Sequence, residues 1–184
     1  MSDASENNKV KEIGGKKFVK KIFQVTNEQG KKLSCMLYEP IAEERPAEKM
    51  PVLIYMHGNA GCRLEAEAYV PKLLTHGINV CAFDFSGCGH SEGEYVTLGW
   101  KERGDLNSVI NHLNSSGSVS KIGLWGRSMG AATSIMYLAE NVDKAHAVVL
   151  DSGFAALTDV INQLGAMMMQ IPPPFMTMLT MSIQ

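Results

Sequence analysis

A serine flanked by glycines is the clearest chemical signature in the chain. The motif Gly126-Arg127-Ser128-Met129-Gly130 lies between an apolar stretch and a run of small residues. A serine hydroxyl is a weak nucleophile unless a neighbouring base takes its proton. A sharp turn from strand to helix would lift the serine oxygen clear of a sheet, and flanking glycines relieve the backbone crowding that such a turn creates. The spacing therefore predicts a nucleophilic serine on a strand-to-helix turn.

The residues after this serine suit a reaction that builds negative charge. Backbone N–H groups at a helix N-terminus carry partial positive charge, so those that follow Ser128 can face an oxyanion as it forms. Ala131 and Ala132 keep the surface small where the helix would meet the sheet. The stretch therefore combines a candidate nucleophile with a candidate oxyanion donor.

The composition limits the class of protein that the chain can represent. With 184 residues and 45% hydrophobic side chains, it is long enough for one globular domain with a sizeable core. The net charge of −2 gives no bulk attraction to nucleic acid, so we expect no nucleic-acid partner. The four cysteines form no C-x-x-C pair, which favours reduced thiols in the cytoplasm. The sequence contains no metal-ligand cluster, phosphate-binding glycine loop, signal peptide or membrane-spanning run, and we expect no cofactor and no metal.

Short apolar runs that alternate with helical patterns indicate how the serine is positioned. Such runs suit strands buried on both faces of a parallel sheet. The expected strands are Phe18–Val25, Lys32–Tyr38, Pro51–Met56, Ile78–Phe83, the stretch from Ile122 to the serine, and Ala147–Leu150, and the expected helices are Leu64–Leu74, Trp100–Leu113 and the segment from the serine to about Ala139. Asn27–Gly30 would join the first two strands as a hairpin. This order predicts an α/β fold with a mostly parallel sheet and helices on both faces.

Three motifs follow three of these strands in order. They are His57-Gly58-Asn59-Ala60-Gly61, Asp84-Phe85-Ser86-Gly87-Cys88-Gly89-His90-Ser91-Glu92-Gly93 and the serine motif. Together they resemble the α/β-hydrolase superfamily, and within it the branch described as serine aminopeptidase S33 or Bem46-like, over Phe18 to Gln184. The resemblance implies an α/β-hydrolase fold that lacks its last strands, because the sequence ends before they would occur; we therefore expect a C-terminally truncated hydrolase.

The resemblance also implies a role for individual residues. The serine of the third motif would be the nucleophile. The backbone N–H groups of Asn59 and Met129 would form the oxyanion hole, where loss of one donor typically costs about 3 kcal/mol of barrier. Gly58 and Gly61 would let the loop backbone approach the substrate, and His57 would hold that loop in place.

The base that this chemistry requires has no evident place in the sequence. In this fold the triad runs serine, acid, histidine along the chain, and no histidine follows Ser128 in a loop that could carry it. His57 would lie nearest and stays a minor alternative as base, with His90 a weaker one. Asp151 either serves as the acid or caps a following helix, and we favour the cap. Loss of a triad serine or histidine costs about 10⁶ in kcat in a serine protease, so the 184-residue chain alone should be nearly inactive.

We divide the chain into a flexible N-terminus, residues 1–15, and a single incomplete hydrolase domain, residues 16–184. Residues 154–184 would begin a cap or lid, where a methionine-rich surface could take an acyl chain or pack against missing parts of the domain. If Ala147–Leu150 is the last strand, it leaves an apolar sheet edge, which is an aggregation risk.

Two functions are in competition on the sequence alone. The first is a serine hydrolase of carboxylic ester or thioester bonds, with a small molecule or an acyl chain as substrate. The second is a catalytically inactive hydrolase fold that acts as a binding or regulatory protein, which the missing acid and histidine favour. We expect a cytoplasmic location, with peripheral membrane contact as the alternative. The motifs specify neither the substrate nor the oligomeric state.

Overall fold

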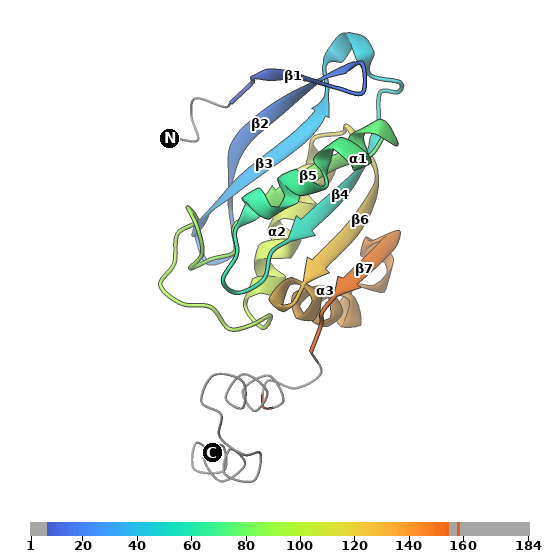
Figure 1. Cartoon of the computed structure of the whole chain (residues 1–184). Coiled ribbons are helices and arrows are strands. Elements are labelled where there is room, and N and C mark those ends of the chain that lie inside the picture. Colours follow the sequence, from blue (N-terminus) through green and yellow to red (C-terminus); the bar gives the residue numbers. More distant parts are fainter. Residues whose placement is uncertain (1–6, 155–157, 159–184) are drawn as a thin grey trace, which may run out of the picture. The chain divides into compact units, whose positions relative to one another are not determined.

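The computed structural model describes residues 7–154 and residue 158. Its strands form one sheet in the order β1-β2-β3-β5-β4-β6-β7 (Figure 1). The strands are β1 (Val10–Ile13), β2 (Lys16–Thr26), β3 (Lys32–Pro40), β4 (Met50–Met56), β5 (Asn79–Phe83), β6 (Val119–Arg127) and β7 (Ala147–Asp151). The α-helices are α1 (Val70–Thr75), α2 (Glu102–Ser115) and α3 (Met129–Glu140), and the 3₁₀ helices are η2 (Ala42–Glu44), η3 (Arg63–Ala68) and η4 (Val142–Lys144).

Helices cover both faces of the sheet, which confirms the predicted fold class. In Figure 1, α1 lies in front of the sheet, and α2 and α3 lie behind it. Side chains alternate between the two faces of a strand, so Ile54 and Met56 of β4 enter the core beneath α2 and α3. Tyr55 enters the separate core beneath α1. This burial on both faces explains why the β4 sequence is a continuous apolar run.

The parallel part of the sheet brings the three sequence motifs to one edge. β4 pairs in parallel with both β5 and β6, and Met56 lies opposite Phe83 on one side and Gly126 on the other. β7 continues the parallel arrangement, with Leu150 opposite Gly126. The loops after β4, β5, β6 and β7 therefore all leave the sheet at the carboxyl ends of its strands, where ligand sites of open α/β sheets lie.

The antiparallel part of the sheet begins with the predicted hairpin. β2 pairs with the whole length of β3, from Phe18 opposite Pro40 to Thr26 opposite Lys32. The Asn27 side-chain oxygen accepts the backbone N–H groups of Gln29 and Lys31 at 3.0 and 2.9 Å, an asparagine turn of the kind that closes hairpins. The hairpin prediction is confirmed.

Two local expectations need correction. The segment expected to be flexible, residues 1–15, contains β1, which pairs antiparallel with β2 and places Val10 opposite Val19. The helix expected over Leu64–Leu74 is split into η3 and α1. Pro71 explains the split, because proline has no N–H to continue an α-helix and is tolerated only within the first turn.

The chain divides into two compact units, Met1–Gly153 and Phe154–Gln184. The first holds the sheet and its helices. The expected cap or lid, residues 154–184, lies outside the described residues apart from Phe154 and Thr158.

β7 stands at one end of the strand order and has an apolar surface. Val148, Val149 and Leu150 are between 40% and 48% exposed. An apolar strand that is half open to water is a candidate for pairing with further chain, and the expectation of an exposed apolar edge therefore holds for the described residues.

Candidate active site

Ser128 is the single residue between the end of β6 and the start of α3. Its backbone has φ 52° and ψ −110°, a left-handed conformation that is strained for a residue with a side chain. Two hydrogen bonds hold it there. The Ser128 N–H donates to the Asp151 carbonyl oxygen at 2.8 Å, and the Ser128 carbonyl oxygen accepts the Ala132 N–H at 3.0 Å. We call residues Gly126–Gly130 the Ser128 turn.

Backbone atoms crowd both glycines of the Ser128 turn. A Cβ on Gly126 would overlap the Gly130 carbonyl oxygen, and a Cβ on Gly130 would overlap the carbonyl oxygen of Met56 in β4. Backbone atoms in a sheet and a helix start cannot move aside as the end of a side chain can. The close approach of α3 to the end of β6 therefore requires glycine at Gly126, and its close approach to β4 requires glycine at Gly130.

A second turn lies directly beside the Ser128 turn, in residues His57–Gly61, which we call the His57 loop. The Gly61 N–H donates to the Gly58 carbonyl oxygen at 2.9 Å and closes a tight turn. A Cβ on Gly58 would lie 3.6 Å from the Ser128 Cβ, so the two turns are in near contact. Asn59 is exposed. The backbones expected to supply the two oxyanion donors, at Asn59 and Met129, thus belong to adjacent segments.

His57 is fully buried and its ring is occupied by the backbone. The Phe85 N–H donates to Nε2 at 3.2 Å, and Nδ1 lies 2.7 Å from the Gly58 carbonyl oxygen. A backbone N–H can only donate, so Nε2 is the acceptor and Nδ1 carries the proton that it shares with Gly58. This tautomer ties the loop to the segment after β5. It leaves neither ring nitrogen for Ser128, which excludes the alternative of His57 as base in this arrangement.

Asp84 and Arg63 form a buried ion pair behind the His57 loop. The Asp84 carboxylate also accepts the N–H groups of Arg63 at 2.7 Å and of His90 at 2.9 Å. A buried carboxylate is costly unless donors of this kind satisfy its oxygens. The pair therefore fixes the start of η3 against the loop after β5. The sequence analysis placed Asp84 in a motif but missed Arg63, whose signal is a charged residue next to a glycine-rich loop.

Glu65 is a second residue that the sequence analysis missed. Its carboxylate accepts the Tyr55 hydroxyl at 2.9 Å and the Arg127 guanidinium at 2.9 Å. Burial, followed by the hydrogen bond and charge of Glu65, raises the pKa of the Tyr55 phenol, so the phenol stays protonated and donates. Glu65 thereby joins β4, η3 and the Ser128 turn.

The remaining histidines are placed away from the Ser128 turn or committed to other partners. His76 ends α1 with Nδ1 2.7 Å from the Lys72 carbonyl oxygen, and the ring of His112 stacks on Phe23. His146 precedes β7 at the amino end of the parallel strands, where its ring accepts the Ile122 N–H at 3.4 Å. The fourth, His90, has Nδ1 3.4 Å from the Arg63 guanidinium.

Asp151 reaches the Ser128 turn through its backbone. Its carbonyl oxygen accepts the Ser128 N–H, while its carboxylate accepts the hydroxyl of Ser152 at 2.8 Å. The helix that Asp151 was expected to cap lies outside the described residues. The described contacts therefore give Asp151 a structural part at the turn.

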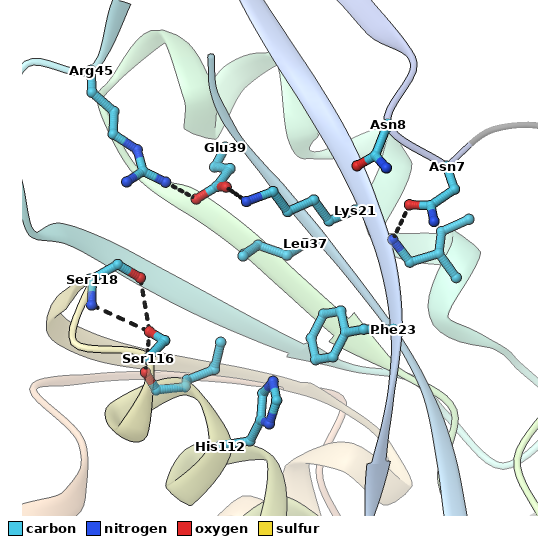
Figure 2. A pocket seen from close by; sticks show the side chains of 12 residues that line it. Asn7, Asn8, Lys21, Phe23, Leu37, Glu39, Arg45, His112, Ser116 and Ser118 are labelled. Atoms are coloured by element: carbon cyan, nitrogen blue, oxygen red, sulfur yellow. Dashed lines mark hydrogen bonds and ion pairs between the residues drawn. The ribbon is translucent and has the colours of Figure 1, made fainter. Parts of the chain in front are cut away.

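Figure 2 shows a hollow lined by other residues of the sheet and helices. It has a volume of about 500 Å³ and is lined by Lys21, Glu39, Arg45 and His112 among others. It also reaches Ser118, at the amino end of β6, whereas Ser128 follows the carboxyl end of the same strand. Nine strand residues span about 30 Å, so this hollow is separate from the candidate active site.

Within residues 7–154, no group of three or more His, Cys, Asp or Glu side chains is arranged to hold a metal ion. No helix in the described part of the chain has the length and apolar character needed to cross a membrane.

Comparison with known proteins assigns the family. Residues 51–177, more than half of the chain, match the model of the alpha/beta hydrolase fold family. The chain therefore belongs to this family.

Individual relatives agree with the assignment. The chain is 28% identical to the protein bem46 of Schizosaccharomyces pombe over 71% of this chain and 44% of that protein. It is 31% identical to the lysophosphatidylserine lipase ABHD12 of Rattus norvegicus over 64% of this chain and 30% of that protein. A crystal structure of the Pyrococcus furiosus esterase Pf2001 superposes with a TM-score of 0.71 at 30% identity, over 89% of this chain and 60% of that one. The chain thus spans less than half the length of these curated relatives.

Proposed function

We propose that the protein is a serine hydrolase of carboxylic ester or thioester bonds with Ser128 as its nucleophile. The observation that carries the proposal is the backbone of Ser128, held at φ 52° between β6 and α3. Strain of this kind persists only where the surroundings enforce it, and it clusters at functional sites. Two features enforce the strained conformation of Ser128. The backbone packs so tightly around Gly126 and Gly130 that neither position has room for a Cβ, and the Ser128 N–H is bonded to the Asp151 carbonyl oxygen.

The two adjacent turns supply a place for the developing charge. In the proposed reaction the Ser128 hydroxyl attacks the acyl carbon, and the N–H groups of Met129 and Asn59 donate to the resulting oxyanion. The alcohol or thiol then leaves, and water releases the acyl group from the serine. The similarity to the Pyrococcus furiosus esterase Pf2001 and to the rat lysophosphatidylserine lipase ABHD12 supports ester chemistry for this chain.

The proton of Ser128 needs an acceptor, and the described contacts of the five histidines are with groups other than Ser128. We propose that the base and its acid are supplied by sequence outside residues 1–184, and that the 184-residue chain by itself has little activity. An isolated oxyanion hole leaves only about 10³–10⁴ of rate enhancement over water.

Turnover by the protein isolated from its source cells tests this proposal. We expect hydrolysis of p-nitrophenyl esters by that protein, and a loss of at least about 10³ in kcat for Ser128→Ala. Intact mass, measured on the same sample, shows whether the active species exceeds the 20.1 kDa of this sequence. Full turnover by Ser128→Ala would rule out Ser128 as the nucleophile.

One observation favours the second candidate, a catalytically inactive fold that binds a partner. It is the commitment of His57 to backbone groups on both sides of its ring. This candidate requires the 184-residue chain to be soluble and to unfold cooperatively, without esterase activity, despite the exposed residues of β7. Aggregation of that chain in the absence of further sequence would contradict it.

We propose a cytoplasmic location, supported by Cys35, Cys62, Cys81 and Cys88, all of which are free thiols. The proposed substrate is a small molecule or an acyl chain, with peripheral membrane contact as a route to the latter. Cell fractionation under low and high salt tests the proposed location and the proposed membrane contact.

A further inference from the structure

We propose that Glu65 is a positioning residue that holds the His57 loop against the Ser128 turn. Its catalytic meaning rests on the proposed hydrolase function, because the two segments matter together only if they supply donors to one oxyanion. The structural part of the proposal, that Glu65 holds the two segments together, depends only on contacts within residues 55–127.

A single carboxylate contacts three elements. Glu65 Oε2 accepts the Tyr55 hydroxyl of β4 at 2.9 Å and lies 2.9 Å from Nη1 of Arg127, the residue immediately before Ser128. The same carboxylate packs against Gly61, where an added Cβ would lie 2.8 Å from Glu65 Cδ. Glu65 therefore contacts the strand, the Ser128 turn and the His57 loop at once.

This contact matters because the proposed oxyanion donors come from separate segments. The Met129 N–H belongs to α3, whereas the Asn59 N–H belongs to the His57 loop. An oxyanion hole requires both donors within hydrogen-bond distance of one point. The Glu65 carboxylate, which contacts both Arg127 and Gly61, therefore sets the distance between the two segments that carry these donors.

The solvent exposure of the link separates a positioning role from a stabilising one. The side chains of Glu65 and Arg127 are 26% and 50% exposed. Ion pairs with this much exposure contribute little to the stability of a fold. Loss of the Glu65 charge should consequently leave the protein folded while it loosens the His57 loop.

Glu67 provides a matched control on the same 3₁₀ helix. Its carboxylate also accepts a tyrosine hydroxyl, that of Tyr38 at 2.8 Å, and also pairs with a cation, Lys20 at 2.8 Å. Those partners lie on β3 and β2, away from the Ser128 turn. Glu67→Gln thus removes an equivalent charge from η3 without touching the proposed site.

Hydrogen exchange of the Gly61 amide, followed by NMR on the 184-residue chain, tests the proposal directly. This N–H is protected by its bond to Gly58. We expect its exchange to accelerate about two- to fivefold in Glu65→Gln and in Arg127→Gln, with no further increase in the double variant. We expect no acceleration in Glu67→Gln, and melting temperatures within about 3 °C of the unchanged protein for Glu65→Gln and Arg127→Gln. Glu67→Gln should melt lower than these two, because it leaves the Lys20 ammonium, 4% exposed, without its carboxylate.

Each outcome decides the matter. Unchanged Gly61 exchange in Glu65→Gln, or equal acceleration in Glu67→Gln, would overturn the positioning role. If Glu65→Gln does not fold, Arg127→Gln tests the same contact, because it removes the other partner of the Glu65–Arg127 ion pair. In protein that reacts with a fluorophosphonate, the labelling rate of Ser128 should fall in Glu65→Gln and not in Glu67→Gln. Absence of any labelling would count against the proposed function. The positioning role of Glu65 would then be decided by the hydrogen exchange of the Gly61 amide alone.

Discussion

The Ser128 turn and the His57 loop both end a buried parallel strand and both contain two glycines, yet they are held in different ways. In the Ser128 turn a Cβ on either glycine would overlap a backbone carbonyl oxygen. In the His57 loop a Cβ on Gly58 would meet atoms only at 3.6 Å or beyond, and one on Gly61 would meet only the end of the Glu65 side chain. Backbone packing fixes the first turn, and side-chain contacts fix the second.

This difference suggests a division of labour between the two turns. The packing of α3 against the sheet leaves the backbone at Ser128 only one conformation. This conformation is strained, but it fixes the position of the proposed nucleophile. The loop proposed to carry the second oxyanion donor depends on His57 and Glu65, whose contacts can be altered one at a time. Substitution of a glycine should therefore destabilise the whole fold at the first turn and only loosen the local structure at the second.

Gly130→Ala should have the largest effect. The new Cβ would overlap the Met56 carbonyl oxygen and lie 2.8 Å from the Met56 Cβ, so α3 would have to move away from β4. We expect the free energy of unfolding to fall by about 3 kcal/mol or more, measured by urea denaturation. Gly104→Ala is the control, because a Cβ on this residue of α2 meets nothing within 4 Å. Equal stability of the two variants would contradict the steric account.

His57→Ala should be the next most damaging change. It leaves the buried Phe85 N–H without its acceptor and opens a cavity beside the Phe85 ring. We expect a loss of about 2–4 kcal/mol in the free energy of unfolding. His112→Ala, which removes an exposed ring from Phe23, should cost less than about 1.5 kcal/mol. A smaller loss for His57→Ala than for His112→Ala would argue against a structural role for His57.

Gly61→Ala should alter the loop more than the fold. The added methyl displaces the Glu65 carboxylate, which is the movable end of a side chain. We expect a loss of less than about 1 kcal/mol in unfolding free energy, together with faster exchange of the residue 61 amide. A stability loss as large as that of Gly130→Ala would show that the loop is held by its backbone after all.

Gly58→Ala should have the smallest effect. Its Cβ would sit at ordinary van der Waals distance from the Ser128 Cβ and the Arg127 carbonyl oxygen, 3.6 and 3.7 Å away. We expect a change within about 0.5 kcal/mol in unfolding free energy. A loss above about 2 kcal/mol would remove the contrast between the two turns.

The sequence predicted those features that have a local pattern. Continuous apolar runs located β4, β5 and β7 to within about two residues, and turn residues located the hairpin after Asn27. The expected positions of these strands and of the hairpin rest on periodicity and on residues with special backbone freedom. That His57 would lie nearest to Ser128 came instead from the strand order that the family resemblance implies, and β4 does pair with β6.

The sequence did not reveal the contacts that lock the site. The Ser128 N–H bonds to Asp151, Arg63 pairs with Asp84, and Glu65 bonds to Arg127 across 62 residues. Contacts between polar groups of the backbone or the side chains that lie far apart in the sequence leave no periodic trace in one sequence. β1 was missed for a related reason: its short polar pattern becomes a strand only because β2 is there to pair with it.

The most direct test of the account is to map the residue that a fluorophosphonate modifies in the protein isolated from its source cells. We expect mass spectrometry to place the adduct on Ser128 and expect no adduct on Ser128→Ala. Modification of a different residue, or no modification of the folded protein, would contradict the assignment of Ser128 as the nucleophile.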